Sequence, residues 1–311
     1  MLRYFKNKFQ SLIRKVLKEE LNLLTNRLDN LKDDSFKILT SKLLLEEIKK
    51  KNINTIKDAE FKVFSQWGDD GIIQYLINNI NIEKEIFIEF GVQDYTESNT
   101  RYLLMNNNWT GLIMDGSKSH IDFVKRDNIY WQYDLKAIQE FVTAENINMI
   151  LEREGFTGEI GLYHIDIDGN DYWIWKATEV ISPVIVIVEY QSLFGFERAI
   201  TTPYRANFVR TKEHHSDLYY GASILALCDL AEDKGYHFIG CNSSGNNAYF
   251  VRKDKIGNLS VLSASEGYVN SKFKESKNPE GRLTYISGDS RLEVIKGMDV
   301  YNTRSQTIEK I

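Results

Sequence analysis

The chain has 311 residues, of which 42% are apolar, 27% charged and 12% aromatic, a profile that indicates a folded globular protein and excludes a disordered tail, a collagen and a disulfide scaffold. Residues 1–60 carry 14 Lys and Arg against 9 Asp and Glu, a net charge of +5, whereas the rest carries 25 against 35, a net charge of −10. Because nucleic-acid binding needs a broad basic surface, this acidic body excludes a nucleic-acid partner.

The first predicted element is a helical N-terminal extension, residues 1–60. Apolar residues recur at alternating spacings of four and three along residues 1–52, as on one face of a helix. This face has three interpretations: packing on the domain or a partner subunit, self-association into a homo-oligomer, or contact of the basic residues 1–20 with an anionic membrane surface. No apolar run approaches about 18 residues and no signal-peptide pattern is present, so we expect no transmembrane segment and a cytoplasmic protein.

Residues 61–257 alternate strands with helices, which predicts a mainly parallel sheet covered on both faces. The predicted helices are Asp69–Asn79, Ser98–Asn106, Ala144–Glu154 and Ser223–Lys234. The predicted strands are Ile86–Phe90, Gly111–Met114, Asn128–Tyr133, Ile160–Ile167 and Val184–Val188. Two further strands, Tyr236–Cys241 and Ala248–Arg252, are joined by six residues, too few for a helical crossover, and must pair antiparallel. The predicted fold is therefore a doubly wound, Rossmann-like α/β sheet with an antiparallel last strand.

The remaining residues, 258–311, are polar and weakly periodic. We expect them to form a loosely packed C-terminal extension. The sequence thus predicts three parts, residues 1–60, 61–257 and 258–311.

Ligands of a doubly wound sheet bind beyond the carboxyl ends of its strands, near the point where the strand order reverses. The first strand ends in Glu89, Phe90 and Gly91, which resembles the acid-x-glycine loop of S-adenosylmethionine (SAM) enzymes. Gly91 would let the backbone approach the methionine moiety, and Glu89 would receive its ammonium group or order the water around it. Tyr95 stands where the last glycine of that loop is usual.

The second and third strands supply two further acids. Asp115 directly follows Met114, where SAM and dinucleotide sites bind the ribose diol, and lies 26 residues after Glu89, about one strand-helix-strand step. Asp134 follows the predicted third strand and is the matching candidate for the adenine edge, with a helix cap as its alternative role. The predicted cofactor-binding residues are Glu89, Gly91, Asp115 and Asp134.

The densest polar cluster follows the fourth and fifth strands. Asp166 and Asp168 lie at the end of the fourth strand, and Glu189 follows the fifth. A carboxylate at the buried centre of a parallel sheet would be severely desolvated, so these acids are expected at open strand ends. Oxygen ligands from adjacent strands suit Mg²⁺, so all three are predicted metal ligands, with hydrogen bonding to the next helix start as the alternative.

A polar loop between the fifth strand and the helix at Ser223 carries His214 and His215. Histidine is the usual general base near neutral pH, and this loop is expected over the same end of the sheet. The predicted catalytic residues are therefore Asp166, which would position the acceptor, and His214 or His215, one of which would take its proton.

Four motifs occur together in this chain: S-Q-W-G-D-D-G-I from Ser65, I-D-I-D-G-N-D-Y from Ile165, V-E-Y from Val188 and G-N-N-A from Gly245. As a set, over residues 61–255, they resemble a bacterial family related to FkbM-like, SAM-dependent methyltransferases. The resemblance implies the class I methyltransferase fold, SAM as the cofactor, and a setting in surface-glycan synthesis.

We therefore expect SAM-dependent O-methylation of a sugar or sugar-linked group in surface polysaccharide (capsule or lipopolysaccharide) biosynthesis, with Mg²⁺ at the acidic cluster. Two rival functions stay open. A metal-dependent hydrolase or phosphotransferase would use the same acids, and a non-catalytic glycan-assembly scaffold would act through residues 1–52.

Overall fold

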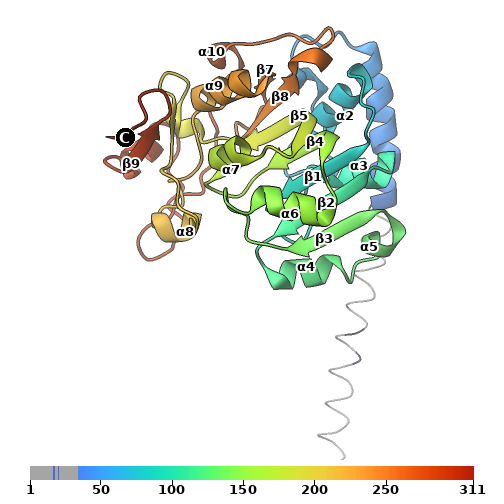
Figure 1. Ribbon diagram of the computed structural model, residues 1–311, viewed down its shortest axis with the longest axis horizontal. Coiled ribbons are helices and arrows are strands. Elements are labelled where there is room, and N and C mark those ends of the chain that lie inside the picture. The colour runs from blue at the N-terminus through green and yellow to red at the C-terminus, as the bar shows by residue number, and fades with distance from the viewer. Residues whose placement is uncertain (1–16, 18–19, 21–33) are drawn as a thin grey trace, which may run out of the picture. The chain divides into compact units, whose positions relative to one another are not determined.

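The computed structural model describes residues 17, 20 and 34–311 (Figure 1). It divides into two compact units, Met1–Lys51 and Asn52–Ile311. In the first unit, residues 34–50 form a helix. Apart from residues 17 and 20, the rest of the predicted N-terminal helix lies outside the described residues, and with it nearly all of the segment expected at a membrane and most of that expected to self-associate.

The second unit begins earlier than the predicted boundary after residue 60. Its first element is the short 3-10 helix η1 (Ile56–Ala59), where Ala59 is fully buried. Ile56 packs in one apolar cluster with Ile72 and Leu76 of helix α2 (Asp69–Asn79). Residues 52–60 are therefore part of the domain, with Ile56 and Ala59 in its core.

The domain is built on a seven-stranded sheet in the order β3-β2-β1-β4-β5-β8-β7 (Figure 1). In that order the strands are β3 (Leu135–Gln139), β2 (Thr110–Asp115), β1 (Ile86–Phe90), β4 (Gly158–Ile165), β5 (Ile181–Glu189), β8 (Asn247–Arg252) and β7 (Tyr236–Cys241). The pairs from β3 to β5 are parallel, whereas β8 runs antiparallel to both of its neighbours. The structure confirms the predicted doubly wound sheet, in which β8, the last strand of this sheet along the chain, is antiparallel.

Helices cover both faces of this sheet. One apolar cluster joins it to α6 (Ile147–Glu154), α7 (Asp171–Ala177) and α9 (Ile224–Lys234). The other joins it to α2, α3 (Arg101–Asn107), α4 (Lys118–Val124) and α5 (Ile129–Gln132). On β1, Ile88 and Phe90 face the first cluster and Phe87 the second, as the alternation of side chains on a strand requires.

The predicted strand Asn128–Tyr133 is wrong, because these residues form α5 and the third strand follows it as β3. The aromatic residues here favour a strand by propensity. The Asp127 carboxylate instead accepts a hydrogen bond from the Ile129 amide at 3.1 Å, and one helical turn buries Ile129 while Trp131 stays exposed. The Asp127 hydrogen bond and the burial of Ile129 therefore favour a helical turn over a strand in this segment.

The expected loose C-terminal extension is also wrong. β9 (Asp299–Asn302) pairs with β10 (Thr307–Lys310) and with β6 (Ile200–Thr201), and together they form a second, three-stranded sheet. Ile295 and Val300 are fully buried in a cluster that includes Phe208. The extension packs because the segment after β5 supplies its apolar partners.

Over the described part of the chain, no helix combines the length and the apolar character needed to cross a membrane.

Candidate functional site

A pocket lies at the carboxyl ends of β1 and β4, where the strand order reverses. Its walls come from four places in the sequence: the segment before α2, the end of β1 and the turn after it, the end of β4, and the start of β8. Its polar lining residues include Gln66, Asp69, Glu89, Gln93, Glu97, Ser98, Asn99, His164, Asp166, Asn246 and Asn247. This is the position at which doubly wound sheets bind their ligands.

The Glu89 carboxylate at the end of β1 is buried and surrounded by donors. One oxygen accepts from the Asn99 amide at 3.0 Å and contacts His164 Nδ1 at 2.9 Å. The other accepts from the Ser98 hydroxyl at 2.5 Å and from the Thr100 amide and hydroxyl. These donors fill the roughly four lone-pair sites of a carboxylate, so Glu89 fixes the segment before α3 and has no oxygen site left for a ligand ammonium.

Burial raises the pKa of the Glu89 carboxyl, but the hydrogen bonds from His164, Ser98 and Thr100 outweigh burial and lower it below its ordinary value. For His164, burial lowers the pKa of the imidazole, and the contact with Glu89 more than reverses that effect. The two side chains therefore form a buried ion pair. This pairing also explains why α3 begins at Arg101 and not at Ser98, because the Ser98 hydroxyl is used by Glu89.

Gly91 lets the ends of β1 and β4 touch. Its φ is +66°, and a Cβ at this position would lie 1.8 Å from the carbonyl oxygen of Asp166. No other residue fits there without moving one of the strand ends. Tyr95, which stands in place of the usual glycine, keeps the left-handed conformation with φ +64° and is fully buried, with its hydroxyl 2.9 Å from Thr100 Oγ1.

Asp115 ends β2 beside the turn that follows β1. One oxygen accepts from the Gln93 amide at 2.9 Å, and the other from the Ser117 amide at 2.7 Å, with His120 Nδ1 at 3.1 Å. The structure thus brings Asp115 to the turn that carries Gly91, as the sequence predicts.

The position of Asp134 does not support its predicted role at the adenine edge. Asp134 precedes β3, and its side chain accepts from the Thr110 hydroxyl at the start of β2, at 2.8 Å. Asp134 therefore lies at the amino edge of the sheet, opposite Asp115. The predicted role is wrong because the third strand begins after Asp134 and does not end before it. The residues at the carboxyl end of β3 are Gln139 and Glu140.

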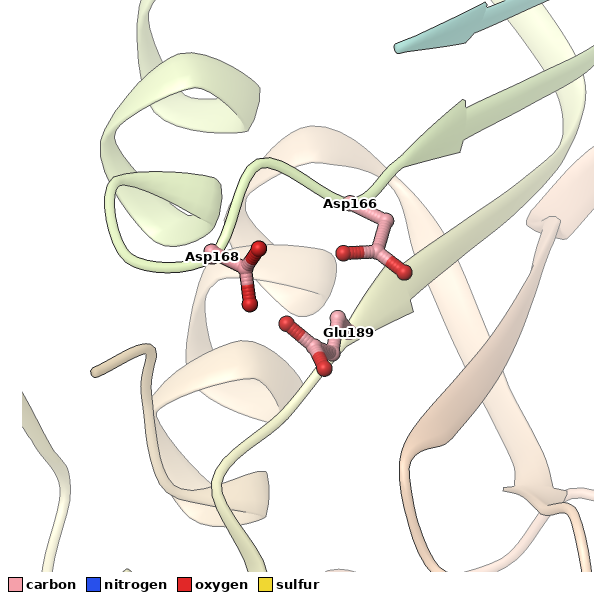
Figure 2. A group of neighbouring side chains, drawn as sticks. All are labelled: Asp166, Asp168 and Glu189. Carbon is pink, nitrogen blue, oxygen red and sulfur yellow. The ribbon is translucent and has the colours of Figure 1, made fainter. Parts of the chain in front are cut away.

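The acidic cluster forms as predicted (Figure 2). One carboxylate oxygen from each of Asp166, Asp168 and Glu189 lies within 4.8 Å of the others. Asp166 follows β4, Glu189 ends β5, and Asp168 sits between β4 and α7 with φ +57°. The Asp171 carboxylate closes that loop by accepting from the Ile167 amide at 2.8 Å and the Gly169 amide at 2.9 Å.

The cluster resists ionisation. Burial, followed by the charge of Asp168, raises the pKa of Asp166 to about 7, and burial followed by Asp166 raises the pKa of Glu189 well above its ordinary value. Oε2 of Glu189 is buried and has no hydrogen-bond partner among the described residues. The three acids therefore have room for a proton or a cation, and their oxygen-only donor set fits Mg²⁺.

Arg210, at the start of α8 (Arg210–Glu213), contacts the acidic cluster and has no role in the sequence prediction. Its guanidinium contacts Asp168 at 2.7 Å and Glu275 at 2.9 Å, donates to the Asp217 carbonyl at 2.6 Å, and lies 3.8 Å from the ring centre of Tyr220. Its partners come from distant parts of the chain, so no spacing in the sequence indicates them.

A second, open cleft of about 420 Å³ adjoins the cluster. Asp168 and Arg210 line it together with Phe141, Ile167, Phe208, Val209, Thr211, Asp217, Glu275, Lys277 and Leu283. Because Asp166 lines the first pocket and Asp168 the second cleft, the acidic cluster stands between the two.

His214 and His215 follow α8 on the loop that borders this cleft, since Thr211 and Asp217 line it. The two imidazoles lie against each other, with ring centres 4.2 Å apart, and His214 Nδ1 is 2.7 Å from the Ser216 hydroxyl. Neither histidine is among the described residues that line the pocket or the cleft. The structure therefore brings the loop, but not its histidines, to the acidic cluster.

Gln66, Asp69 and Asn247 are further pocket residues without a role in the sequence prediction. Their motifs, S-Q-W-G-D-D-G-I and G-N-N-A, are visible in the sequence. The sequence does not show that β8 pairs antiparallel with β5, and this pairing places the two distant motifs in contact with each other.

No protein-family model and no curated protein matches this chain. Solved structures of similar shape include the N-terminal domain of EvdMO1 with SAH bound, at 9% identity, over 60% of this chain and 80% of that one, with a TM-score of 0.38. An S-adenosylmethionine-dependent methyltransferase from Clostridium acetobutylicum is 10% identical over 59% of this chain and 90% of that one, with a TM-score of 0.37. An O-methyltransferase from Bacillus cereus in complex with SAH is 13% identical over 59% of this chain and 80% of that one, with a TM-score of 0.36. The strand order, with β8 antiparallel between β5 and β7, is itself the Rossmann-like class I methyltransferase arrangement that the sequence predicts.

Proposed function

We propose that this chain is a SAM-dependent methyltransferase that methylates an oxygen of a sugar or sugar-linked acceptor. The observation that carries the proposal is the pocket at the switch point of a sheet with this strand order. Gly91 would border the methionine moiety and Asp115 the ribose, while Glu89 holds the surrounding segment in place.

The cleft beside the acidic cluster suits a hydroxylated acceptor. Its lining combines the ion-paired side chains of Arg210 and Lys277 with the apolar faces of Phe141 and Phe208. Such a mixture fits the polar edges and apolar faces of a sugar. Together with the resemblance of the motifs, it supports an acceptor from surface polysaccharide synthesis.

Methyl transfer is an in-line displacement, so the protein must align the acceptor hydroxyl with the sulfonium and accept one proton. Asp166 borders both the pocket and the acidic cluster, and its pKa of about 7 suits a general base near neutral pH. We assign the proton to Asp166 and not to His214 or His215.

Asp168 and Glu189 would hold Mg²⁺, for which the unpaired Oε2 of Glu189 is a free ligand atom, while Asp166, the third acid of the cluster, would stay unligated as the base. When bound, the ion would lower the pKa of the acceptor hydroxyl. Removal of divalent ions with EDTA should then abolish turnover, Mg²⁺ should restore it, and affinity for S-adenosylhomocysteine (SAH) should not change. Full turnover after exhaustive chelation would leave Asp166 as a base without a metal.

Calorimetric titration with SAH tests the proposed function. Asp115→Ala should weaken SAH binding by about 1.5–3 kcal/mol, the value of hydrogen bonds to a charged group. Asp134→Ala is the matched control, because Asp134 lies at the opposite edge of the sheet and its loss should leave affinity unchanged.

Turnover is then measured as transfer of labelled methyl from SAM to nucleotide sugars and glycan fragments. Hydrolysis or phosphoryl transfer without SAH binding would favour the rival metal-dependent enzyme. SAH binding with no turnover on any acceptor would favour a scaffold.

A further inference from the structure

Two buried oxygen atoms in the pocket lack hydrogen-bond donors. They are Oδ2 of Asp69 and Oδ1 of Asn247, neither of which has a partner among the described residues. Both residues line the pocket, and they are 0% and 3% exposed. A buried acceptor without a donor is unfavourable, so two in one pocket indicate a ligand that donates hydrogen bonds.

Asp69, the first residue of α2, is held by three side chains that all use the same oxygen. Oδ1 accepts from Asn242 Nδ2 at 2.9 Å, from Asn247 Nδ2 at 3.0 Å and from the Tyr249 hydroxyl at 2.5 Å. Oδ2 is left to the pocket. The carboxylate is thus fixed in place with one oxygen saturated and the other unused.

The same bonds fix the orientation of the Asn247 amide. Its nitrogen must face Asp69, because the reverse orientation would bring two acceptor oxygens together. Its own Oδ1 therefore points away from that contact and is the second unpaired atom. The site consequently presents a carboxylate oxygen and an amide oxygen, both of which accept and neither of which donates.

The neighbouring Asp70 shows what a structural aspartate does in this segment. Its Oδ2 accepts from the amides of Val63, Phe64 and Ser65, at 2.7–2.8 Å, and so holds the chain that leads into α2. Asp70 does not line the pocket. Oδ1 of Asp70, like Oδ2 of Asp69, has no partner among the described residues, but only the unpaired oxygen of Asp69 belongs to a residue that lines the pocket.

We infer that Asp69 and Asn247 bind the α-ammonium group of SAM, an inference that rests on the proposed function. An ammonium group has three donors and no acceptor, which matches these two oxygens. Glu89, the residue that the sequence indicates for this role, is saturated by its own donors and neutralised by His164. Asp69 supplies the negative charge, and Glu89 acts as a positioning residue.

The test is calorimetric titration of the full chain with two ligands, SAH and an SAH analogue in which hydrogen replaces the α-amino group. The wild type should bind SAH about 10- to 100-fold more tightly, the range expected for charged hydrogen bonds. Asp69→Asn should lower SAH affinity by about the same factor and change affinity for the analogue less than about 3-fold. Asp70→Asn is the matched control and should leave the ratio of the two affinities unchanged.

Asn247→Ser tests the same site without removing a charge, which matters if Asp69→Asn does not fold. It should weaken SAH binding about 3- to 10-fold, again with little effect on the analogue. Equal losses for both ligands in the folded variants, or a preference for SAH that persists in them, would overturn the inference while the proposed function stands. A wild type that binds neither ligand would reject the proposed function, and the inference with it.

Discussion

Two groups of acids lie at the same edge of the sheet and behave in opposite ways. Around Glu89, donors from His164 and the 98–100 segment fill the carboxylate and lower its pKa. Around Asp166, carboxylates face one another, and the pKa rises to about 7. Glu89 and Glu189 are both buried, so the number of donors, and not burial alone, decides whether an acid serves as scaffold or as a titratable group.

The largest expected effect is on turnover. Asp166→Asn removes the proposed base and should lower kcat by about 10²–10⁴-fold, the usual contribution of a general base, with SAH affinity within about 3-fold of wild type. Asp254→Asn is the control, because Asp254 pairs with Arg252 outside the site. A variant that retains wild-type kcat would move the base elsewhere.

Glu89→Gln tests the saturated group. The substitution turns an acceptor into a donor against Ser98 and Thr100 and leaves His164 without its counter-ion, so the free energy of unfolding should fall by about 2–4 kcal/mol in urea denaturation. Glu159→Gln, at a more exposed pair with Arg252, should cost less than about 1 kcal/mol. Equal costs for both variants would contradict the assigned scaffold role.

The two groups should also respond to pH with opposite sign. The pKa of Asp166 is raised in the folded state, so its contribution to stability is complete below about pH 4 and is lost as the pH rises through 7. The pKa of Glu89 is lowered, so its contribution is present above the unfolded value and is lost as the pH falls through the folded one.

Asp166→Asn should therefore be more stable than the wild type above pH 7, by on the order of 1 kcal/mol, and gain less near pH 4. Urea unfolding at several pH values measures this difference. A gain that is the same at every pH would show that Asp166 titrates normally.

The smallest effect concerns Arg210. Removal of its charge from beside Asp168 should make the acids harder to ionise, so Arg210→Gln should move the acidic limb of the kcat/KM profile upward by about 0.5–1 pH unit. Arg210→Lys should restore most of that shift. An unmoved profile would separate Arg210 from the electrostatics of the cluster.

The sequence predicted those features that depend on local spacing. Asp115 and Glu189 end buried strands and Asp166 directly follows one, so their edge of the sheet could be inferred from strand ends alone. The predicted position of Asp134 is wrong because the aromatic helical turn before it, α5, has the amino-acid composition of a strand. Arg210 and Asp69 could not be assigned, because their roles depend on contacts with Asp168 and Asn247, far away in sequence.

The C-terminal region shows the same limit. Arg291 is almost fully buried, and its guanidinium donates to the carbonyl and the hydroxyl of Ser271. A polar, weakly periodic sequence gives no sign of such packing, since the apolar partners come from the segment after β5.

A crystal structure of the full chain with SAH tests the central claim most directly. The account predicts that the ribose hydroxyls meet Asp115, that the α-amino nitrogen lies within hydrogen-bond distance of Asp69 Oδ2, and that the sulfur faces Asp166. SAH bound away from the carboxyl ends of β1 and β4, or no SAH at saturating concentration, would contradict it.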